Sequence, residues 1–241
     1  MKLADIDIKE RLTDFSSLGI TAPSQKILKM INEGNIPSEV EKALKEGKII
    51  IDPLPNLEPT ENESSFLGSS TIDLQLGIKF ETLNAPFEVA DNECGGKIIR
   101  RCVFDINQKS KYQNLREYTG VTDEQGGWIS FEIGWNDTFQ LDPNVQVNAF
   151  TKQIVCIPDD LEGDLGGRSS MARKGISAHI SSSRFDAGFC GGVTMEINNS
   201  VQCSFFLKPG TRFCSLGFHQ LSRKVAVPYY HKKNAHFSGQ H

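Results

Sequence analysis

Residues 167–199 hold most of the side chains in this chain that could bind an anion or move protons. A Gly-Arg-Ser-Ser turn carries Arg168 and leads into Met-Ala-Arg, which ends at Arg173. This pattern predicts the start of a helix with a serine as its N-cap. The free N–H groups of a helix N-terminus suit phosphate, and Arg168 would add donors there. A capped surface helix with an exposed arginine is the simpler alternative.

Two carboxylates follow this turn. Asp186 lies in a Phe-Asp-Ala-Gly turn, where an aspartate commonly bonds its own backbone and could instead accept a hydrogen bond from a sugar hydroxyl. Glu196 lies in an apolar, strand-like run, and the two-residue period of a strand places it on the same face as Thr194. Glu196 is therefore either part of a solvated face or a partly buried general base and acid.

The elements that would position these side chains are mainly short strands. Residues 24–47 favour helix on both sides of Pro37, and Gly47 is typical of a helix C-terminus. Turn residues then separate most of a series of apolar runs, at 49–51, 72–76, 128–133, 145–150, 154–157, 193–197, 204–207 and 212–218. Many short strands with few helices indicate a sandwich, jelly roll or barrel. Residues 85–127 are polar, and we expect loops with one or two strands there.

The composition limits the class of protein. The chain has 241 residues, 38% apolar and 23% charged, as an ordinary globular protein has. A net charge of −4 argues against a general nucleic-acid coat but allows an anionic small ligand at a local arginine cluster. No signal-peptide region and no apolar run near the ~20 residues of a membrane span are visible. We therefore expect a cytoplasmic protein with neither nucleic acid nor membrane as a partner.

The six cysteines contain no C-x-x-C pair. Zinc sites and redox motifs both favour short paired spacings, so neither is indicated. Reduced, mostly buried thiols are expected, because free cysteine packs as a small hydrophobic residue.

The stretch from Leu161 to Phe218 resembles the deoxycytidine triphosphate (dCTP) deaminases of the trimeric dUTPase-like superfamily. Residues 69–77, SSTIDLQLG, resemble the family's early S-x-D-x-R-L-G strand, with Gln75 where arginine is common. Residues 40–53 resemble its opening helix and strand, and Leu-Lys-Pro-Gly at 207–210 with Leu-Gly-Phe at 216–218 resemble its closing strands.

The resemblance implies a mainly β fold, a dUTPase-like distorted β-barrel or jelly roll with a short helical N-terminal segment. Residues 1–35 would form an N-terminal helical extension. Residues 36–241 would form the dCTP deaminase domain, with a C-terminal lid over about 226–241.

The activity that the resemblance implies is hydrolytic deamination of dCTP to dUTP and ammonia, in pyrimidine deoxynucleotide biosynthesis. Glu196 would be the catalytic proton shuttle, and Ser169 and Arg173 would position the water and favour the charged glutamate, whereas burial would favour the protonated acid. The residues implied in substrate binding are Arg168, Ser170, His179, Ser182, Arg184, Asp186, Tyr229, His236 and Gln240. The family acts as a homotrimer with sites between subunits, so one chain would carry an incomplete site.

The sequence indicates which metal ions the reaction would need. Zinc-dependent nucleobase deaminases need H-x-E and P-C-x-x-C, and this sequence has neither. A deaminase built on it would activate water with a carboxylate, without a metal ligand from the protein. Mg²⁺ is expected on the triphosphate, bound mainly by phosphate oxygens and water. Thymidine triphosphate is a further candidate ligand, since it often inhibits members of the family.

The C-terminal residues 235–240, AHFSGQ, resemble the A-K-Y-x-x-Q run of the family's lid. His236 replaces a phosphate-binding lysine, which makes phosphate binding weaker or dependent on pH. A frayed terminus is the alternative.

Three functions stay open at this point. The chain could form dUTP, it could be a bifunctional enzyme that forms dUMP and diphosphate, or it could be a non-catalytic nucleotide-binding regulator. Arg184 matches the deaminase-only type, whereas Asp186-Ala-Gly also occurs in bifunctional relatives. A plain dUTPase is disfavoured, because such enzymes lack the counterpart of Glu196 and end in a glycine-rich motif that is absent here.

Overall fold

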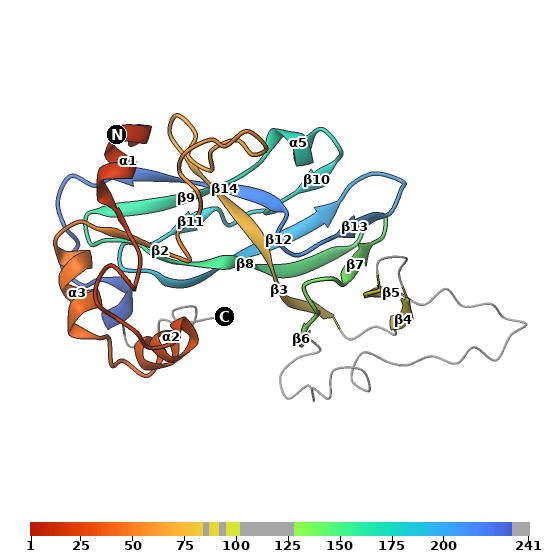
Figure 1. The fold of residues 1–241 in the computed structure, drawn as a ribbon, viewed down its shortest axis with the longest axis horizontal. Coiled ribbons are helices and arrows are strands. Elements are labelled where there is room, and N and C mark those ends of the chain that lie inside the picture. Colours follow the sequence, from red (N-terminus) through yellow and green to blue (C-terminus); the bar gives the residue numbers. More distant parts are fainter. Residues whose placement is uncertain (84–86, 92–94, 102–127, 233–241) are drawn as a thin grey trace, which may run out of the picture.

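The structure is a computed structural model that describes residues 1–83, 87–91, 95–101 and 128–232. Its helices and strands are shown in Figure 1. The helices are α1 (Asp5–Arg11), α2 (Ser24–Asn32), α3 (Ser38–Lys45), α5 (Ser169–Ala172) and the 3₁₀ turn η1 (Tyr229–His231). The strands are β1 (Leu12–Thr13), β2 (Ile49–Asp52), β3 (Ile72–Leu83), β4 (Phe87–Asp91), β5 (Lys97–Arg101), β6 (Trp128–Glu132), β7 (Thr138–Leu141), β8 (Gln146–Cys156), β9 (Leu161–Gly167), β10 (Ile176–Ser177), β11 (Arg184–Phe185), β12 (Cys190–Asn199), β13 (Phe205–Leu207) and β14 (Arg212–Gln220).

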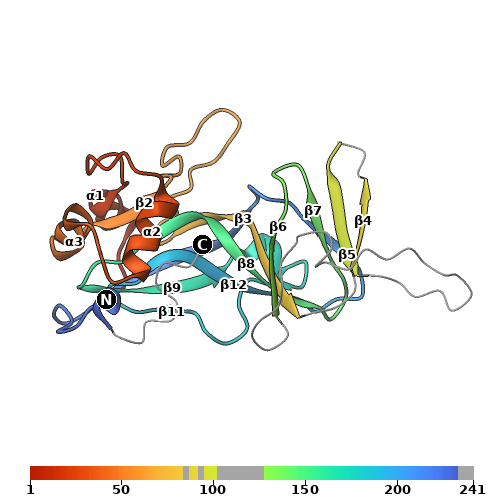
Figure 2. The ribbon, with the colours of Figure 1, turned by 90° about the horizontal axis from the view of Figure 1, so that it is seen from below.

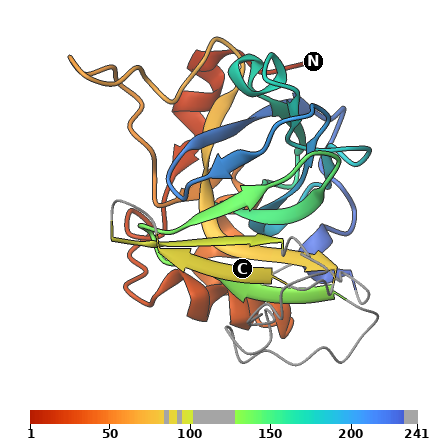
Figure 3. The ribbon, with the colours of Figure 1, turned by 90° about the vertical axis from the view of Figure 1, so that its right-hand side faces the viewer.

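The strands form two sheets among the described residues. The larger has ten strands in the order β1-β2-β8-β3-β14-β9-β11, with β12 also paired to β8, β10 to β12 and β6 to β3. The smaller has the order β13-β7-β5-β4. Helices α1–α3 lie at one end of the molecule and strands β4–β7 at the other, as Figure 2 shows. Figure 3 looks onto the end that carries β4 and β5, drawn in yellow. The prediction of a mainly β fold with a short helical N-terminal segment is confirmed.

The first 35 residues pack onto the larger sheet. The Leu3 N–H donates to the Phe218 carbonyl oxygen at 2.9 Å, and β1 pairs in parallel with β2. Ile8 is fully buried in the main core, and Ile27 and Leu28 of α2 are buried in a second cluster with β2 and β8. The boundary at residue 35 stays a prediction, but this segment shares its apolar contacts with the rest of the chain.

The helical stretch predicted at 24–47 forms two helices. α2 ends before Gly34, and α3 begins after Pro37, whose ring fits the first turn of a helix but not its interior. Gly47 has φ 85°, the left-handed conformation that glycine supplies at a helix end. The break at Pro37 and the stop at Gly47 are both confirmed.

Strand β9 is a structural feature that sequence patterns missed. Its sequence, LEGDLGG, is too rich in glycine for a strand prediction, but it pairs with β14 from Leu161↔Gln220 to Gly167↔Cys214. At Gly163 a Cβ atom would lie 2.7 Å from Ile157 Cδ1, so the absence of a side chain permits the close packing. Tertiary pairing therefore overrides local propensity in this strand.

Two cysteines depart from the expectation of reduced thiols. Cys156 and Cys190 are directly opposite each other on β8 and β12 and form a disulfide. Cys214 is buried and free, and burial raises the pKa of its thiol. The expectation is thus wrong for the pair, whose contact depends on a strand register that spacing alone does not reveal.

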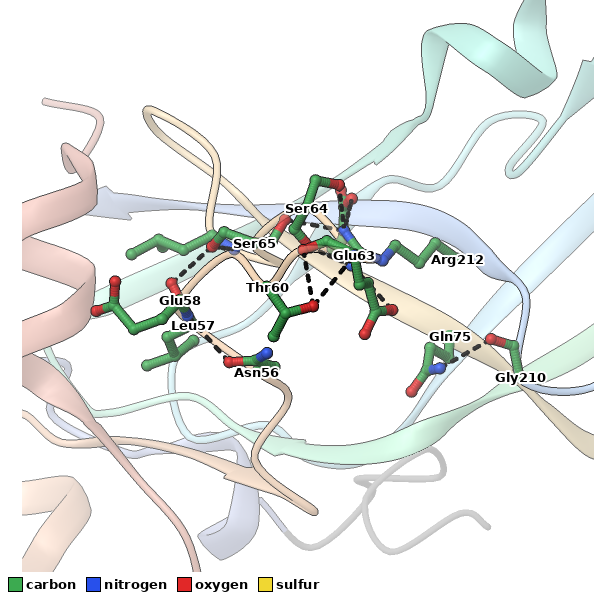
Figure 4. Close-up of polar contacts among 12 residues, drawn as sticks. Asn56, Leu57, Glu58, Thr60, Glu63, Ser64, Ser65, Gln75, Gly210 and Arg212 are labelled. Atoms are coloured by element: carbon green, nitrogen blue, oxygen red, sulfur yellow. Dashed lines mark hydrogen bonds and ion pairs between the residues drawn. The ribbon is translucent and has the colours of Figure 1, made fainter.

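Arg212 of β14 fixes the loop before β3. Its guanidinium donates to the Ser65 carbonyl oxygen at 2.8 Å and pairs with Glu63 at 3.0 Å (Figure 4). It also lies over the ring of Phe66. In the same region Gln75, which stands where the family often has arginine, donates to the Gly210 carbonyl oxygen at 2.8 Å. β3 and β14 pair directly, with Arg212 opposite Gln75, and these contacts tie the flanking loops to that pair of strands.

None of the described helices is both long and apolar enough to cross a lipid bilayer.

Candidate active site

Three neighbouring strands place Glu196 in a row of polar side chains. Glu196 on β12 lies opposite Asn148 on β8, and Asn148 lies opposite Glu81 on β3. Residues opposite each other in antiparallel strands point to the same face of the sheet. On β12 the flanking Met195 and Ile197 are buried, whereas Glu196 is half-buried. The alternation predicted for this strand is therefore present, and it turns Glu196 away from the core.

The face that carries Glu196 opens into a cavity of about 450 Å³. Five residues that the resemblance implied for the site line it together: Ser182, Arg184, Asp186, Glu196 and Tyr229. Five further residues that were not predicted complete the lining: Glu81, Asn148, Phe185, Phe189 and Thr194. A cavity of this size, with apolar walls and a few converging polar groups, is typical of a small-ligand site.

The carboxyl group of Glu196 is held by the backbone of the segment before β11. Its Oε2 atom accepts from the Ile180 N–H at 3.1 Å and from the Ser181 N–H at 3.4 Å. Among the described residues, no hydrogen bond reaches the other oxygen, Oε1. The side chain is thus oriented through one oxygen, and the second is available to exchange a proton.

Aromatic rings form one wall of the cavity. Phe185 and Phe189 meet edge to face with centroids 4.8 Å apart, and Phe189 lies 6.3 Å from the ring of Tyr229. Such a wall suits a planar ring, since aromatic groups stack or meet edge-on with favourable quadrupole contacts.

The turn that carries Asp186 is covered by the chain after residue 227. Gly188 has φ 84°, and a Cβ atom there would lie only 2.5 Å from the Tyr229 backbone nitrogen. A glycine at this position lets Tyr229 approach the turn closely. Lys232 donates to Asp186 Oδ2 at 2.7 Å and lies over the Tyr229 ring. The last described residues therefore reach the mouth of the cavity.

A buried polar contact anchors this covering segment. Tyr230 is buried in the second core cluster, and its hydroxyl donates to Asp159 Oδ1 at 3.0 Å. Burial raises the pKa of Asp159, against the hydrogen bond from Tyr230, and burial also raises the pKa of the Tyr230 hydroxyl. The pair fixes η1, and with it Tyr229, beside the cavity.

The Gly-Arg-Ser-Ser turn lies apart from this cavity in the single chain. It forms α5, and none of Arg168, Ser169, Ser170 or Arg173 lines the cavity around Glu196. The predicted serine N-cap is wrong: Arg168 is the N-cap, and no side chain caps the helix. None of the residues of α5 is buried, so water can satisfy the N–H groups of its first turn.

Arg168 and His179 have local surroundings of their own. Arg168 Nε lies 3.0 Å from Asp73 Oδ2, and its guanidinium also donates to the Arg212 carbonyl oxygen. Burial raises the pKa of Asp73, against the charges of Arg168 and Arg212. His179 directly precedes Ile180, and its buried Nδ1 atom has no hydrogen-bond partner in the described part of the chain. Two predicted residues, His236 and Gln240, lie outside the described residues.

In the described part of the chain, no three His, Cys, Asp or Glu side chains gather into a group that could hold a metal ion.

Comparisons with known proteins identify the class. The family model for dCTP deaminase-like proteins matches residues 37–221. The chain therefore belongs to the dCTP deaminase-like family, and the resemblance to the dCTP deaminases is confirmed.

Individual relatives carry two kinds of name. The chain is 31% identical over 202 residues to a "dCTP deaminase, dUMP-forming" of Dictyoglomus thermophilum, covering 84% of this chain and 88% of that protein. It is 32% identical over 198 residues to a "dCTP deaminase" of Thermomicrobium roseum, covering 82% and 85%. The 2′-deoxycytidine 5′-triphosphate deaminase structure from Agrobacterium tumefaciens matches 64% of this chain and 41% of that chain, with a TM-score of 0.40 and 14% identity.

Proposed function

We propose that this protein deaminates dCTP hydrolytically, with Glu196 as the proton shuttle. One observation carries the proposal: Glu196 is half-buried in the cavity, held through Oε2 and free to exchange a proton through Oε1. Family membership supports the substrate class. A carboxyl group that is oriented and partly shielded from water suits general base and acid catalysis.

The reaction that fits this geometry begins with a water molecule beside Glu196. The carboxylate takes a proton from the water as its oxygen attacks C4 of the cytosine. Glu196 delivers this proton to N3. It then takes the second proton of the former water from the new hydroxyl group on C4 and delivers it to the leaving amino group. The C4–N bond breaks, ammonia leaves and C4 becomes a carbonyl carbon, so that dCTP and water give dUTP and ammonia.

The other residues around the cavity would each contact a different part of the nucleotide. Phe185, Phe189 and Tyr229 offer the aromatic wall for the base. Asp186 would accept a hydrogen bond from the deoxyribose, exchanging its contact with Lys232 for one with the sugar. Ser182 and Arg184 would contact the base and sugar from the neighbouring segment. His179, which precedes the two donors to Glu196, would shape the base pocket.

Residues of the Gly-Arg-Ser-Ser turn would reach the cavity from a neighbouring subunit. In one chain Ser169 and Arg173 are exposed and do not line the cavity that holds Glu196. In a homotrimer with sites between subunits, they would position the water there, and Arg168 and Ser170 would hold phosphate oxygens of the magnesium complex of dCTP. We infer that the complete site forms only on assembly. His236 and Gln240 would close it from the C-terminal lid.

The product that we propose is dUTP. Arg184 matches the deaminase-only type, whereas the relatives include both dUTP-forming and dUMP-forming enzymes. The bifunctional alternative forms dUMP and diphosphate from the same deaminated intermediate. Inhibition by thymidine triphosphate and a cytoplasmic location stay predictions.

The test is one assay that resolves three products. Purified protein with dCTP and Mg²⁺ is expected to release ammonia in step with dUTP. Accumulation of dUMP and diphosphate would establish the bifunctional reaction instead. Binding of dCTP without any ammonia would establish the non-catalytic, regulatory function.

A further inference from the structure

We propose that Asn148 is a positioning residue for Glu196: its side-chain oxygen accepts the hydrogen bond of the Glu196 carboxyl group while that group holds the proton. The inference rests on the proposed function, in which Glu196 carries a proton between water and base. It adds a residue that neither the motif nor the family resemblance indicates.

The strand register brings the two side chains together. Asn148 on β8 is directly opposite Glu196 on β12, and both line the same cavity. Directly opposed residues of antiparallel strands have Cβ atoms about 4.5–5.5 Å apart. A glutamate and an asparagine at that separation are within reach of a side-chain hydrogen bond.

The hydrogen-bonding state of Asn148 shows that an acceptor is unused. Its Oδ1 atom is buried and has no hydrogen-bond partner among the residues that the structure describes. A buried carbonyl oxygen without a donor is unfavourable, so such an atom takes a donor when one is supplied. On its two sides stand Glu81 and Glu196, whose carboxylates only accept hydrogen bonds while they are ionised.

Protonation of Glu196 supplies the missing donor. The Oε2 atom of Glu196 already accepts from Ile180 and Ser181, so the proton belongs on Oε1. An O–H group on Oε1 can then donate to Asn148 Oδ1. The amide suits this place, because its Nδ2 can donate to an ionised Glu81 on the other side. Asn148 thus stabilises the protonated form of Glu196.

Other charged groups also face Glu196 and must be held constant. Glu81 from β3, Arg184 from β11, Asp186 from the following turn and Tyr229 from η1 line the same cavity. Lys232 pairs with Asp186, and His179 lies just before Ile180. Substitutions at Asn148 change none of these residues. Because Asn148→Leu also removes the amide donor to Glu81, the comparison is repeated in a Glu81→Gln background, where a change in the titration of Glu196 reports on Asn148.

The direct test measures the titration of Glu196 by NMR in the nucleotide-free full chain, with ¹³C in the glutamate carboxyl groups. The Glu196 signal is assigned by its absence in Glu196→Gln. Asn148→Leu is expected to lower the midpoint by about half to one pH unit, the equivalent of one net hydrogen bond. Asn148→Asp, nearly isosteric, is expected to raise it, because a like charge disfavours the ionised carboxylate.

A matched control residue, Asn198, lies two residues after Glu196 on strand β12. Asn198 is on the same face of β12 but does not line the cavity. Asn198→Leu is therefore expected to leave the Glu196 midpoint unchanged. Equal shifts from Asn198→Leu and Asn148→Leu, or midpoints in both Asn148 variants that match the wild type, would overturn the inference.

Kinetics separate this inference from the proposed function. The acid limb of kcat/KM for dCTP is expected to move down in pH for Asn148→Leu and up for Asn148→Asp. If the wild type releases ammonia and neither profile nor midpoint moves, the role of Asn148 is refuted and the proposed function stands. If the NMR midpoints move as expected but the wild type releases no ammonia, the hydrogen bond stands and the proposed function fails.

Discussion

The backbone N–H of Ile180 donates to Oε2 of Glu196 at 3.1 Å, joining the segment before β11 to strand β12. This bond ties the candidate proton shuttle to the same segment that continues into Arg184 and Asp186. The position of the carboxyl group and the shape of the cavity are therefore set by one stretch of backbone. A change in that stretch is expected to affect catalysis and ligand binding together.

Asp186 is predicted to serve binding more than chemistry. Asp186→Ala is expected to raise KM for dCTP about 10- to 100-fold with a smaller change in kcat, because a hydrogen bond to a charged group is lost. Asp164→Ala is the control, since Asp164 lies opposite Arg184 on β9 without lining the cavity. Steady-state kinetics decide the point, and a fall in kcat alone would place Asp186 in the chemical step.

Gly188 is predicted to be required for the covering segment. Gly188→Ala combines a left-handed backbone with a contact of 2.5 Å to the Tyr229 nitrogen. Gly210→Ala is a matched control, because Gly210 has φ 83° but open space around its Cβ position. The control is expected to lose about 1–2 kcal/mol of unfolding free energy, and Gly188→Ala more. Urea unfolding measures both, and equal losses would show that Tyr229 moves away freely.

The pH dependence of stability is predicted to carry a contribution from Asp73. Burial raises the pKa of Asp73 above its ordinary value of 3.8, so the folded protein keeps this proton to higher pH than the unfolded chain. Between the two pKa values folding takes up a proton, and stability therefore falls as pH rises. Asp73→Asn removes this contribution.

Urea unfolding of the wild type and Asp73→Asn at a series of pH values above 4 checks the sign. The stability of the wild type relative to the variant is expected to decrease as pH rises through this window. An increase would show that the ion pair with Arg168, at 3.0 Å, outweighs burial.

Local patterns in the sequence predict much of the fold, and the family resemblance implies five of the ten residues that line the cavity. The alternation in β12 correctly turns Glu196 out of the core, and the break at Pro37 and the stop at Gly47 are present. These features depend on neighbours along the chain. Asn148 and Glu81 escaped prediction because they meet Glu196 only through the register of three strands that are far apart in sequence.

The same physical reason accounts for the other differences. The glycine-rich β9 forms because β14 pairs with it, and Cys156 meets Cys190 through the β8–β12 register. The Gly-Arg-Ser-Ser turn shows the opposite case, in which residue types suggest a contact that the single chain does not make. Its residues suit one nucleotide site by type, yet in the single chain α5 lies outside the cavity around Glu196.

The most direct test of the central claim compares Glu196→Gln with the wild type. The glutamine keeps a carbonyl oxygen for the N–H groups of Ile180 and Ser181, but it cannot carry the proton. With dCTP and Mg²⁺, the variant is expected to lose ammonia release by about 10²- to 10⁴-fold while binding dCTP as the wild type does. Ammonia release near the wild-type rate would contradict the assignment of Glu196 as the proton shuttle.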